Sequence, residues 1–111
     1  MEKKEKGYRW EKIVLEYYLS NWWSLVDQNY TIPGGEIDLI LEKNQIIIFC
    51  EVKVVDNTED LAGYVSQKKL QTLKKTIESY CQKNNVEKDI RLDLIFVKHW
   101  KILESYENIY F

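Results

Sequence analysis

The feature that most constrains this chain is an apolar run that ends in two charges. The segment Ile46-Ile-Ile-Phe-Cys-Glu-Val-Lys53 begins as a continuous hydrophobic strand, the pattern of a strand buried on both faces. Because side chains alternate along a strand, Glu51 and Lys53 are expected to share one face with Ile47. Burying either charge costs several kcal/mol unless it is compensated. The compensation is either a structural ion pair or a divalent metal ion bound by Glu51, with Lys53 beside it.

The composition is that of one globular domain. With 111 residues, 45% of them hydrophobic, the chain is long enough to build the core of one domain but too short for two domains. We expect a single domain over residues 1–111, with the charged residues 1–6 as a flexible N-terminal segment. No apolar run approaches the roughly 20 residues that cross a bilayer, so no membrane association is expected. Cys50 and Cys81 lack metal-ligand spacing and indicate buried thiols of a cytoplasmic protein.

Hydrophobic periodicity predicts an α/β domain with a mixed β-sheet and a helix on each side, in the order α-β-β-β-α-β-β. The helices are expected at about 7–21 and 64–83. The strands are expected at 22–32, 36–41, 46–53, 91–98 and 102–111, the last as a strand or an edge hairpin. A hairpin loop at 42–45 and a longer loop at 54–62 complete the chain.

A second acidic position lies on the strand at 36–41. Glu36 and Asp38 alternate there with apolar residues, which is also the ordinary pattern of a strand whose acids face water. The short hairpin places this strand beside the one at 46–53, so Asp38 is expected within reach of Glu51 at cross-strand spacings of about 5 Å. Opposed carboxylates destabilise a sheet unless a cation lies between them. We therefore expect the two carboxylates within roughly 4–5 Å, with Lys53 on the same side.

Glu11 is a third acid in an unexpected position. At about 100° per residue, Glu11 lies on the same side of the helix as Val14 and away from the polar stripe that contains Glu16. We expect Glu11 to be well buried and to point toward the 51–53 end of the sheet. The alternative is an exposed glutamate that stabilises the N-terminal end of the helix dipole.

The basic and aromatic residues leave two interpretations open. The net charge of −2 is not typical of a nucleic-acid-binding domain, and only Arg9 and Arg91 are arginines, so a DNA contact would follow backbone shape more than base sequence. The lysines of the second helix form either a solvated face or a phosphate-binding track: Lys68, Lys69, Lys74, Lys75 and Lys83. Four aromatic residues are either core or base-stacking groups: Tyr17, Tyr18, Trp22 and Trp23.

Two carboxylates, a lysine and an extra glutamate are a suitable set for Mg²⁺, or for Mn²⁺, because these ions take oxygen ligands and usually bind one or two carboxylates plus a substrate phosphate. Such a site suits phosphodiester hydrolysis. The metal polarises the phosphoryl oxygen and lowers the pKa of a bound water, while a nearby lysine positions that water or stabilises the developing charge.

The segments Gly35-Glu-Ile-Asp-Leu-Ile40 and Phe49-Cys-Glu-Val-Lys53 together resemble the signature of the PD-(D/E)XK nucleases. In detail the chain resembles the YraN-like bacterial proteins of that superfamily, which are related to archaeal Holliday-junction resolvases. Further matches extend the resemblance over about residues 7–97: Gly7 with Glu11, Val65-Ser-Gln-Lys-Lys69, and Arg91-Leu-Asp-Leu94.

The resemblance implies a restriction-endonuclease-like fold and a set of site residues. Asp38 and Glu51 would be metal ligands for Mg²⁺ or Mn²⁺, and Lys53 would be the catalytic lysine. Glu11 would be an auxiliary acid and a further metal ligand, and Glu36 matches another acid of the family's pattern. The second helix would contact DNA through Gln67, Lys68 and Lys69.

Three functions remain open at this stage. The first is a metal-dependent endonuclease acting on branched or otherwise structured DNA. The second is a nucleic-acid-binding domain on a nuclease fold with little or no catalysis. The third is a small interaction module whose charges form a structural network. Because resolvases of this architecture act as twofold dimers on twofold junctions, the first function carries the expectation of a homodimer.

Overall fold

The computed structural model describes residues 2–55 and 66–109 of the chain, with side chains from Trp10 onward within those ranges. The elements are α1 (Glu2–Ser20), β1 (Ser24–Ile32), β2 (Gly35–Lys43), β3 (Ile46–Val54), α2 (Gln67–Asn84), β4 (Asp89–Lys98) and β5 (Lys101–Tyr106). The strands form one sheet in the order β1-β2-β3-β4-β5, in which β3 and β4 are parallel and the other neighbours antiparallel. The predicted element order and mixed sheet are confirmed, and they are compatible with a restriction-endonuclease-like fold.

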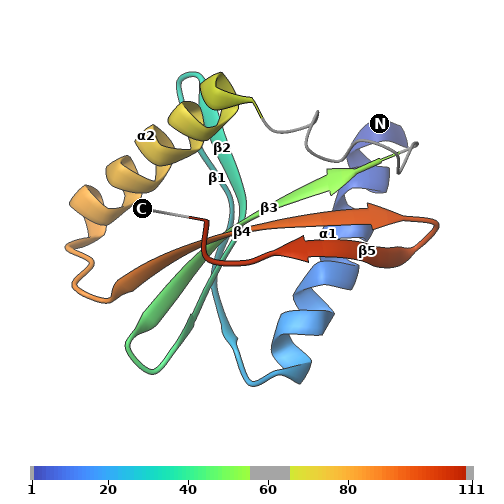
Figure 1. Ribbon diagram of the computed structural model, residues 1–111, viewed down its shortest axis with the longest axis horizontal. Coiled ribbons are helices and arrows are strands. Elements are labelled where there is room, and N and C mark those ends of the chain that lie inside the picture. Colours follow the sequence, from blue (N-terminus) through green and yellow to red (C-terminus); the bar gives the residue numbers. More distant parts are fainter. Residues whose placement is uncertain (1, 56–65, 110–111) are drawn as a thin grey trace.

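The two helices pack against opposite faces of the sheet (Figure 1). The core under α2 includes Leu73, Ile77, Tyr80, Ile47, Phe49 and Leu92. The core under α1 includes Trp10, Val14, Tyr18, Leu39, Ile48 and Cys50. Residues 47–50 therefore alternate between two cores, which confirms the prediction that β3 is buried on both faces. Neither of these helices, the only ones within the described ranges, is long and apolar enough to cross a membrane.

Helix α1 begins and ends differently from the prediction. It starts at Glu2 rather than near Gly7, so the segment 2–6 that was expected to lie outside the helix is part of it. The sequence Glu-Lys-Lys-Glu-Lys consists of good helix formers, which explains the early start. The helix ends at Ser20, and Trp22 takes a left-handed backbone conformation with φ 71°. The predicted strand start at Trp22 is therefore wrong, and β1 begins at Ser24.

Helix α2 has a cap at each end. The hydroxyl of Ser66 accepts a hydrogen bond from the backbone N–H of Lys69 at 3.0 Å, and Asn85 closes the other end in a left-handed conformation with φ 49°. The end lies one residue beyond the predicted Lys83. The predicted start at residues 64–65 and most of the predicted loop at 54–62 lie outside the described residues.

The strands are longer than predicted where tight turns extend them. Asn44 adopts a left-handed conformation with φ 55°, which lets β2 continue to Lys43 and leaves a two-residue hairpin in place of the predicted loop at 42–45. The N–H of Asp89 donates to the carbonyl of Gln45 at 2.8 Å and extends β4 by two residues. Strand β5 ends at Tyr106 as a single edge strand, and residues 110–111 lie outside the described part.

One fully buried acid connects several elements. Asp93 on β4 accepts hydrogen bonds from the Tyr18 hydroxyl at 2.7 Å, from Arg91 Nη2 at 2.8 Å, and from the backbone N–H of Asn108 at 3.0 Å. Such a set of donors compensates for the burial of a carboxylate. The acid therefore binds α1 and the segment after β5 to the centre of the sheet.

Candidate active site

The site lies where the sheet divides. The β2–β3 ladder runs from Lys43 paired with Ile46 to Leu39 paired with Cys50. Beyond that point, β2 continues beside β1 alone, and β3 continues beside β4 alone. Figure 1 shows the two pairs of strands separating toward α2 and α1 respectively. The separation opens a fork between neighbouring strands, with a helix on each side.

Asp38 lies at the point of separation. Its Oδ2 atom accepts a hydrogen bond from the backbone N–H of Val52 at 2.7 Å, so a side chain takes the place of the next ladder partner. The alternation of β2 also changes here, because Ile37 and Ile40 both pack in the α2 core although a regular strand would point them to opposite faces. Asp38 is 9% exposed. The interpretation of Asp38 as a water-facing acid is therefore wrong.

Glu51 lies on the other side of the fork and is 5% exposed. Lys69 of α2 has its Nζ 2.8 Å from Glu51 Oε2, and Lys53 has its Nζ 3.8 Å from the same oxygen. Lys53 thus lies on the side of Glu51, as predicted. Both lysines keep about a third of their side chains exposed, so they extend from the buried acid to the surface.

The two buried acids interact directly with each other. Burial raises the pKa of Asp38 well above its usual range, the hydrogen bond to Glu51 and repulsion from it raise the pKa further, and the N–H of Val52 opposes the shift. The prediction that Asp38 and Glu51 lie together across the strands is confirmed. Because two buried carboxylates repel when both are ionised, the pair retains a proton at neutral pH unless another positive charge joins it.

Glu11 approaches this pair from α1. Burial, followed by repulsion from Glu36 and Glu51, raises the pKa of Glu11 to about 7, and a hydrogen bond with the Asn29 side chain opposes the shift. The prediction that Glu11 points toward the acid pair is confirmed. Glu11 was expected to be well buried, but it is only half-buried, at the edge of the fork.

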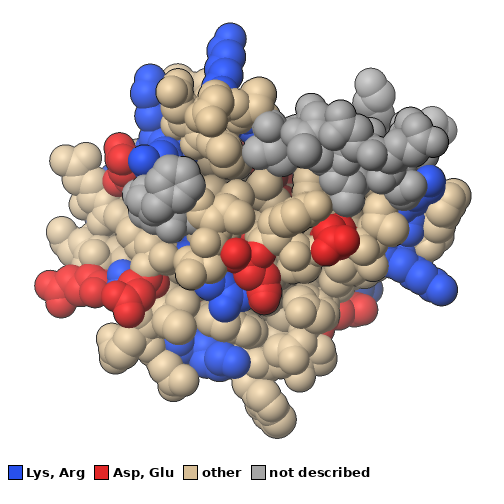
Figure 2. All heavy atoms as spheres, in the orientation of Figure 1, with Lys and Arg blue, Asp and Glu red and all other residues tan. Residues whose placement is uncertain are grey.

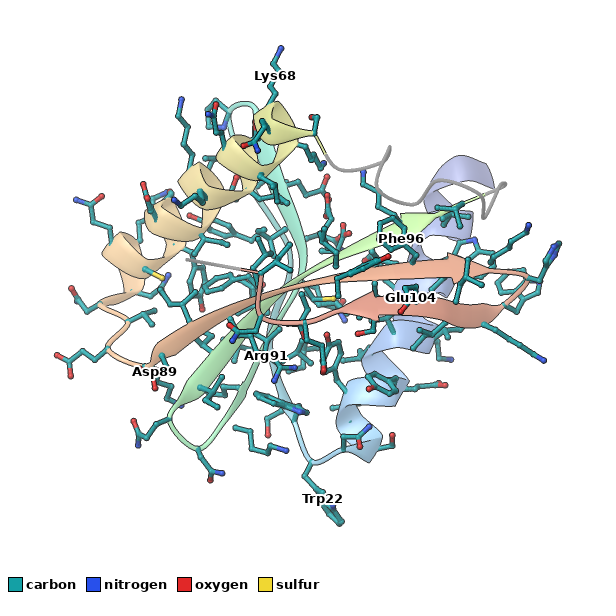
Figure 3. All side chains as sticks on the ribbon, viewed as in Figure 1. Trp22, Lys68, Asp89, Arg91, Phe96 and Glu104 are labelled. Carbon is teal, nitrogen blue, oxygen red and sulfur yellow. The ribbon has the colours of Figure 1, made fainter. Side chains whose placement is uncertain are left out.

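The remaining predicted residues lie at the rim or outside the fork. Glu36 is exposed, and its effect on the cluster is electrostatic: its repulsion of Glu11 helps to raise the pKa of Glu11. Gln67 and Lys68 are exposed in the first turn of α2, and Lys68 points away from the molecule (Figure 3). The structure thus brings five of the predicted residues together: Glu11, Asp38, Glu51, Lys53 and Lys69.

The acid pair fits a divalent cation by its chemistry, because Asp38 and Glu51 are two buried carboxylates that repel each other and offer oxygen ligands. The lysine ammonium groups supply that charge to Glu51. No group of three or more His, Cys, Asp or Glu side chains in the described part of the chain is arranged to hold a metal ion. The set for a cation is therefore Asp38 and Glu51, and the expected third ligand, Glu11, does not complete a three-residue group.

Two features of the site were not predicted. Asn29 has a left-handed backbone with φ 53°, and its side chain hydrogen-bonds Glu11. The one available signal was residue type, since Asn tolerates this conformation better than most residues. A pocket of about 350 Å³ also opens beside Lys69 and Glu36. Gly35 lines it, and a Cβ atom there would collide with the Thr76 hydroxyl, so only glycine fits without a shift of α2.

The fold and the site define a class of protein: a small α/β domain whose divided sheet holds a buried acid pair bound by lysines. The chain belongs to the uncharacterised protein family UPF0102, whose model matches residues 10–97. This match includes every residue of the acid–lysine cluster.

Several relatives carry the same family designation. The UPF0102 protein of Aliarcobacter butzleri is 36% identical over 107 residues, which cover 96% of each chain. A UPF0102 protein of Campylobacter jejuni is 37% identical over 87 residues, or 78% of this chain and 77% of the relative. One from Campylobacter hominis is 31% identical over 103 residues, or 93% and 91% of the two chains.

Proposed function

We propose that this protein is a Mg²⁺- or Mn²⁺-dependent endonuclease of the PD-(D/E)XK type, close to the YraN-like proteins, which cuts phosphodiester bonds in branched or otherwise structured DNA. The observation that carries the proposal is the buried contact between Asp38 and Glu51, with Lys53 on the open side of the pair. Two buried acids that face each other contribute little to the stability of a fold, so their presence indicates a functional role.

Asp38 and Glu51 would hold the metal ion. Their carboxylates are the buried oxygen ligands of the fork, and the Val52 N–H fixes the orientation of Asp38. A bound Mg²⁺ or Mn²⁺ would polarise the scissile phosphate and lower the pKa of a water molecule. Glu11, with a pKa near 7, can exchange a proton close to neutral pH and would serve as the auxiliary acid. Glu36 would contribute charge at the rim.

The two lysines would act on the substrate side. Lys53 extends from Glu51 to the surface, where its ammonium can position the attacking water or stabilise charge on the phosphate. Lys69 would release Glu51 when a cation binds and then contact a phosphate oxygen.

DNA would reach the site along α2. Basic side chains project from the end of the molecule where α2 begins (Figure 2). Lys68 is exposed there, next to Gln67, and is free to contact backbone phosphate. A twofold homodimer would present two such sites to a twofold DNA junction. With DNA as its substrate, the protein would act in the cytoplasm.

A second candidate function is nucleic-acid binding on a nuclease fold with little or no catalysis. The contact that favours it is the 2.8 Å ion pair between Lys69 and Glu51, which already satisfies one acid of the pair. The net charge of −2 and the presence of only two arginines agree with either function, since they weaken contact with DNA as a whole.

The deciding experiment is a cleavage assay with Mg²⁺ or Mn²⁺ on duplex, flap and four-way-junction DNA. Asp38→Asn and Lys53→Ala should each abolish metal-dependent cleavage, because they remove a ligand charge and the water-positioning cation. Matched controls are Glu42→Gln, a half-exposed acid elsewhere on β2, and Lys101→Ala, an exposed lysine of β5. Both controls should retain cleavage.

Binding measured in Ca²⁺ separates the two candidates. Junction affinity should fall clearly for a double change of Lys68 and Lys69 to Ala and only slightly for Lys53→Ala. A wild-type protein that binds junctions through Lys68 and Lys69 but cuts neither DNA nor RNA with either metal would favour the binding function and refute the catalytic one.

A further inference from the structure

A second pocket lies away from the acid pair, where α1 ends and β1 begins. It has a volume of about 370 Å³ and combines aromatic rings with the side chains of Lys43, Arg91 and Glu107. Lys43 and Asp38 are five residues apart on β2, which separates the pocket from the acid pair by roughly 17 Å along the strand. The pocket therefore does not belong to the candidate active site.

Trp22 occupies a backbone position that normally suits glycine. The N–H of Trp22 donates to Leu19 and that of Trp23 donates to Tyr18, each at 3.1 Å, which is the Schellman arrangement at a helix end. Trp22 has the left-handed φ of 71° that this motif requires, a conformation that is unusual for a bulky side chain. Its presence there calls for a reason other than backbone geometry.

Packing does not supply that reason. Trp22 is 85% exposed, and Figure 3 shows it pointing away from the body of the molecule. Its neighbour Trp23 is 8% exposed and meets the Tyr18 ring edge-on at 6.4 Å, so Trp23 makes the hydrophobic contact that accompanies a Schellman motif. The fold thus accounts for Trp23 and leaves the exposed indole of Trp22 available to a ligand.

The pocket also contains a cation, Lys43, that forms no ion pair with the residues that the structure describes. The Lys43 ammonium donates to the backbone carbonyl of Asn21 at 3.0 Å and lies 4.6 Å from the centre of the Trp23 ring. Both of these partners are uncharged. Arg91, by contrast, is bound by Asp93 at 2.8 Å and lies 3.5 Å from Glu107. Lys43 is therefore the group in this pocket that can bind an anion.

We propose that this pocket binds one unpaired nucleotide, with the base stacked on Trp22 and the phosphate against Lys43. An exposed indole beside an unneutralised ammonium matches the flat base and the charged phosphate of a nucleotide. The volume is that of a small-molecule site, and the partly exposed ring of Tyr17 adds a second aromatic wall. This site goes beyond the proposed endonuclease, because it requires neither the acid pair nor cleavage.

Two sources share this chemistry: a free mononucleotide and an unpaired nucleotide within a strand. The test measures binding in EDTA, so that no cleavage occurs, to a fluorescently labelled oligothymidylate, to the same oligonucleotide in a fully paired duplex, and to thymidine monophosphate as a competitor. The wild type should bind the single strand more tightly than the duplex. Displacement by the mononucleotide would assign the site to free nucleotides, and lack of displacement would assign it to unpaired bases in a strand.

Variants of the pocket connect this binding to Trp22 and Lys43. Trp22→Ala should weaken single-strand binding by at least about fivefold, and Trp22→Phe should retain most of it. Lys43→Gln should weaken binding and reduce the slope of log affinity against log salt by about 0.7. The matched controls, Leu103→Ala and Lys101→Gln, change exposed residues on β5 and should leave the affinity unchanged.

Two results would overturn the proposal. The first is equal single-strand affinity of the wild type and Trp22→Ala, with both proteins folded by circular dichroism. The second is a loss of self-association in Trp22→Ala, by sedimentation, without a change in nucleotide affinity. That result would assign the exposed residues Leu19, Trp22 and Leu25 to a contact between two copies of the chain. A protein that cuts DNA but gives either result refutes the nucleotide pocket and leaves the endonuclease proposal intact.

Discussion

The Nζ atom of Lys69 lies 2.8 Å from Oε2 of Glu51, and this contact joins the start of α2 to the end of β3. Partial burial lowers the pKa of Lys69, but the hydrogen bond and attraction from Glu51 outweigh it, so the pKa is raised overall. The cation closest to Glu51 is thus a helix residue and not Lys53, which lies two positions further along the same strand.

This geometry predicts unequal effects of removing the two lysines. Lys69→Ala should lower the free energy of unfolding of the metal-free protein by about 1 kcal/mol, which is less than for a fully buried charged hydrogen bond because the Lys69 side chain is 35% exposed. Lys53→Ala should cost less, since its contact is longer. Urea denaturation in EDTA measures both, with Lys75→Ala as the exposed control on α2. A larger loss for Lys53→Ala would contradict the prediction.

Substitutions of Asp38 should separate charge from hydrogen bonding. Asp38→Asn keeps an oxygen that can accept from Val52 and cannot ionise against Glu51, so it should be neutral or stabilising in EDTA at neutral pH. Asp38→Ala leaves the N–H of Val52 without its acceptor and should cost about 1–3 kcal/mol. Urea denaturation of both variants against the wild type provides the measurement. Equal destabilisation by Asn and Ala would show that the acceptor for the Val52 N–H does not account for the difference expected between the two variants.

The raised carboxyl pKa values predict a definite sign for the pH dependence of stability. Burial and repulsion raise the pKa of Glu11 from 4.5 to about 7, so between these values the folded protein binds more protons than the unfolded chain. The free energy of unfolding should therefore fall as pH rises through this window, and the raised pKa of Asp38 extends the fall to higher pH.

Glu11→Gln isolates the contribution of Glu11. Relative to the wild type, this variant should gain stability as pH increases from about 5 to 8, because only the wild type loses the bound proton. Urea denaturation in EDTA at several pH values in this range gives the comparison. A difference between the two proteins that does not change with pH would place the pKa of Glu11 near its ordinary value.

Metal binding should stabilise the folded protein at neutral pH. A ligand at a hundred times its dissociation constant adds about 2.7 kcal/mol, so Mg²⁺ at that level should raise the melting temperature of the wild type by roughly 10 °C. Asp38→Asn should lose this increase, whereas Glu42→Gln, an acid elsewhere on β2, should keep it. Identical melting curves in Mg²⁺ and in EDTA would count against a cation site of useful affinity.

Some parts of the fold follow from rules that act over a few residues. The apolar run that ends at Cys50 was enough to predict a strand buried on both sides, because burial and alternation act locally. The closeness of Asp38 and Glu51 followed from one short hairpin, since a tight turn sets which residues of two strands face each other.

Other parts depend on tertiary contacts that no short segment specifies. The contact of Lys69 with Glu51 requires the placement of α2 against the sheet, and residues between β3 and α2 do not encode it locally. The role of Asn29 depends on α1 bringing Glu11 to β1. The left-handed turn at Trp22 was missed because an aromatic residue is uncommon there, and its side chain favours a strand instead.

The hydrogen bond from Val52 to Asp38 has a consequence for how the site is assembled. The same oxygen that ends the pairing of β2 with β3 belongs to the acid that would bind a cation. Turning Asp38 away from the fork would break its partly buried hydrogen bond with the Val52 N–H, so its rotamer is chosen during folding and not during ligand binding. Any molecule that has completed its sheet therefore already holds this carboxylate in position, and no later closing motion is needed to prepare it.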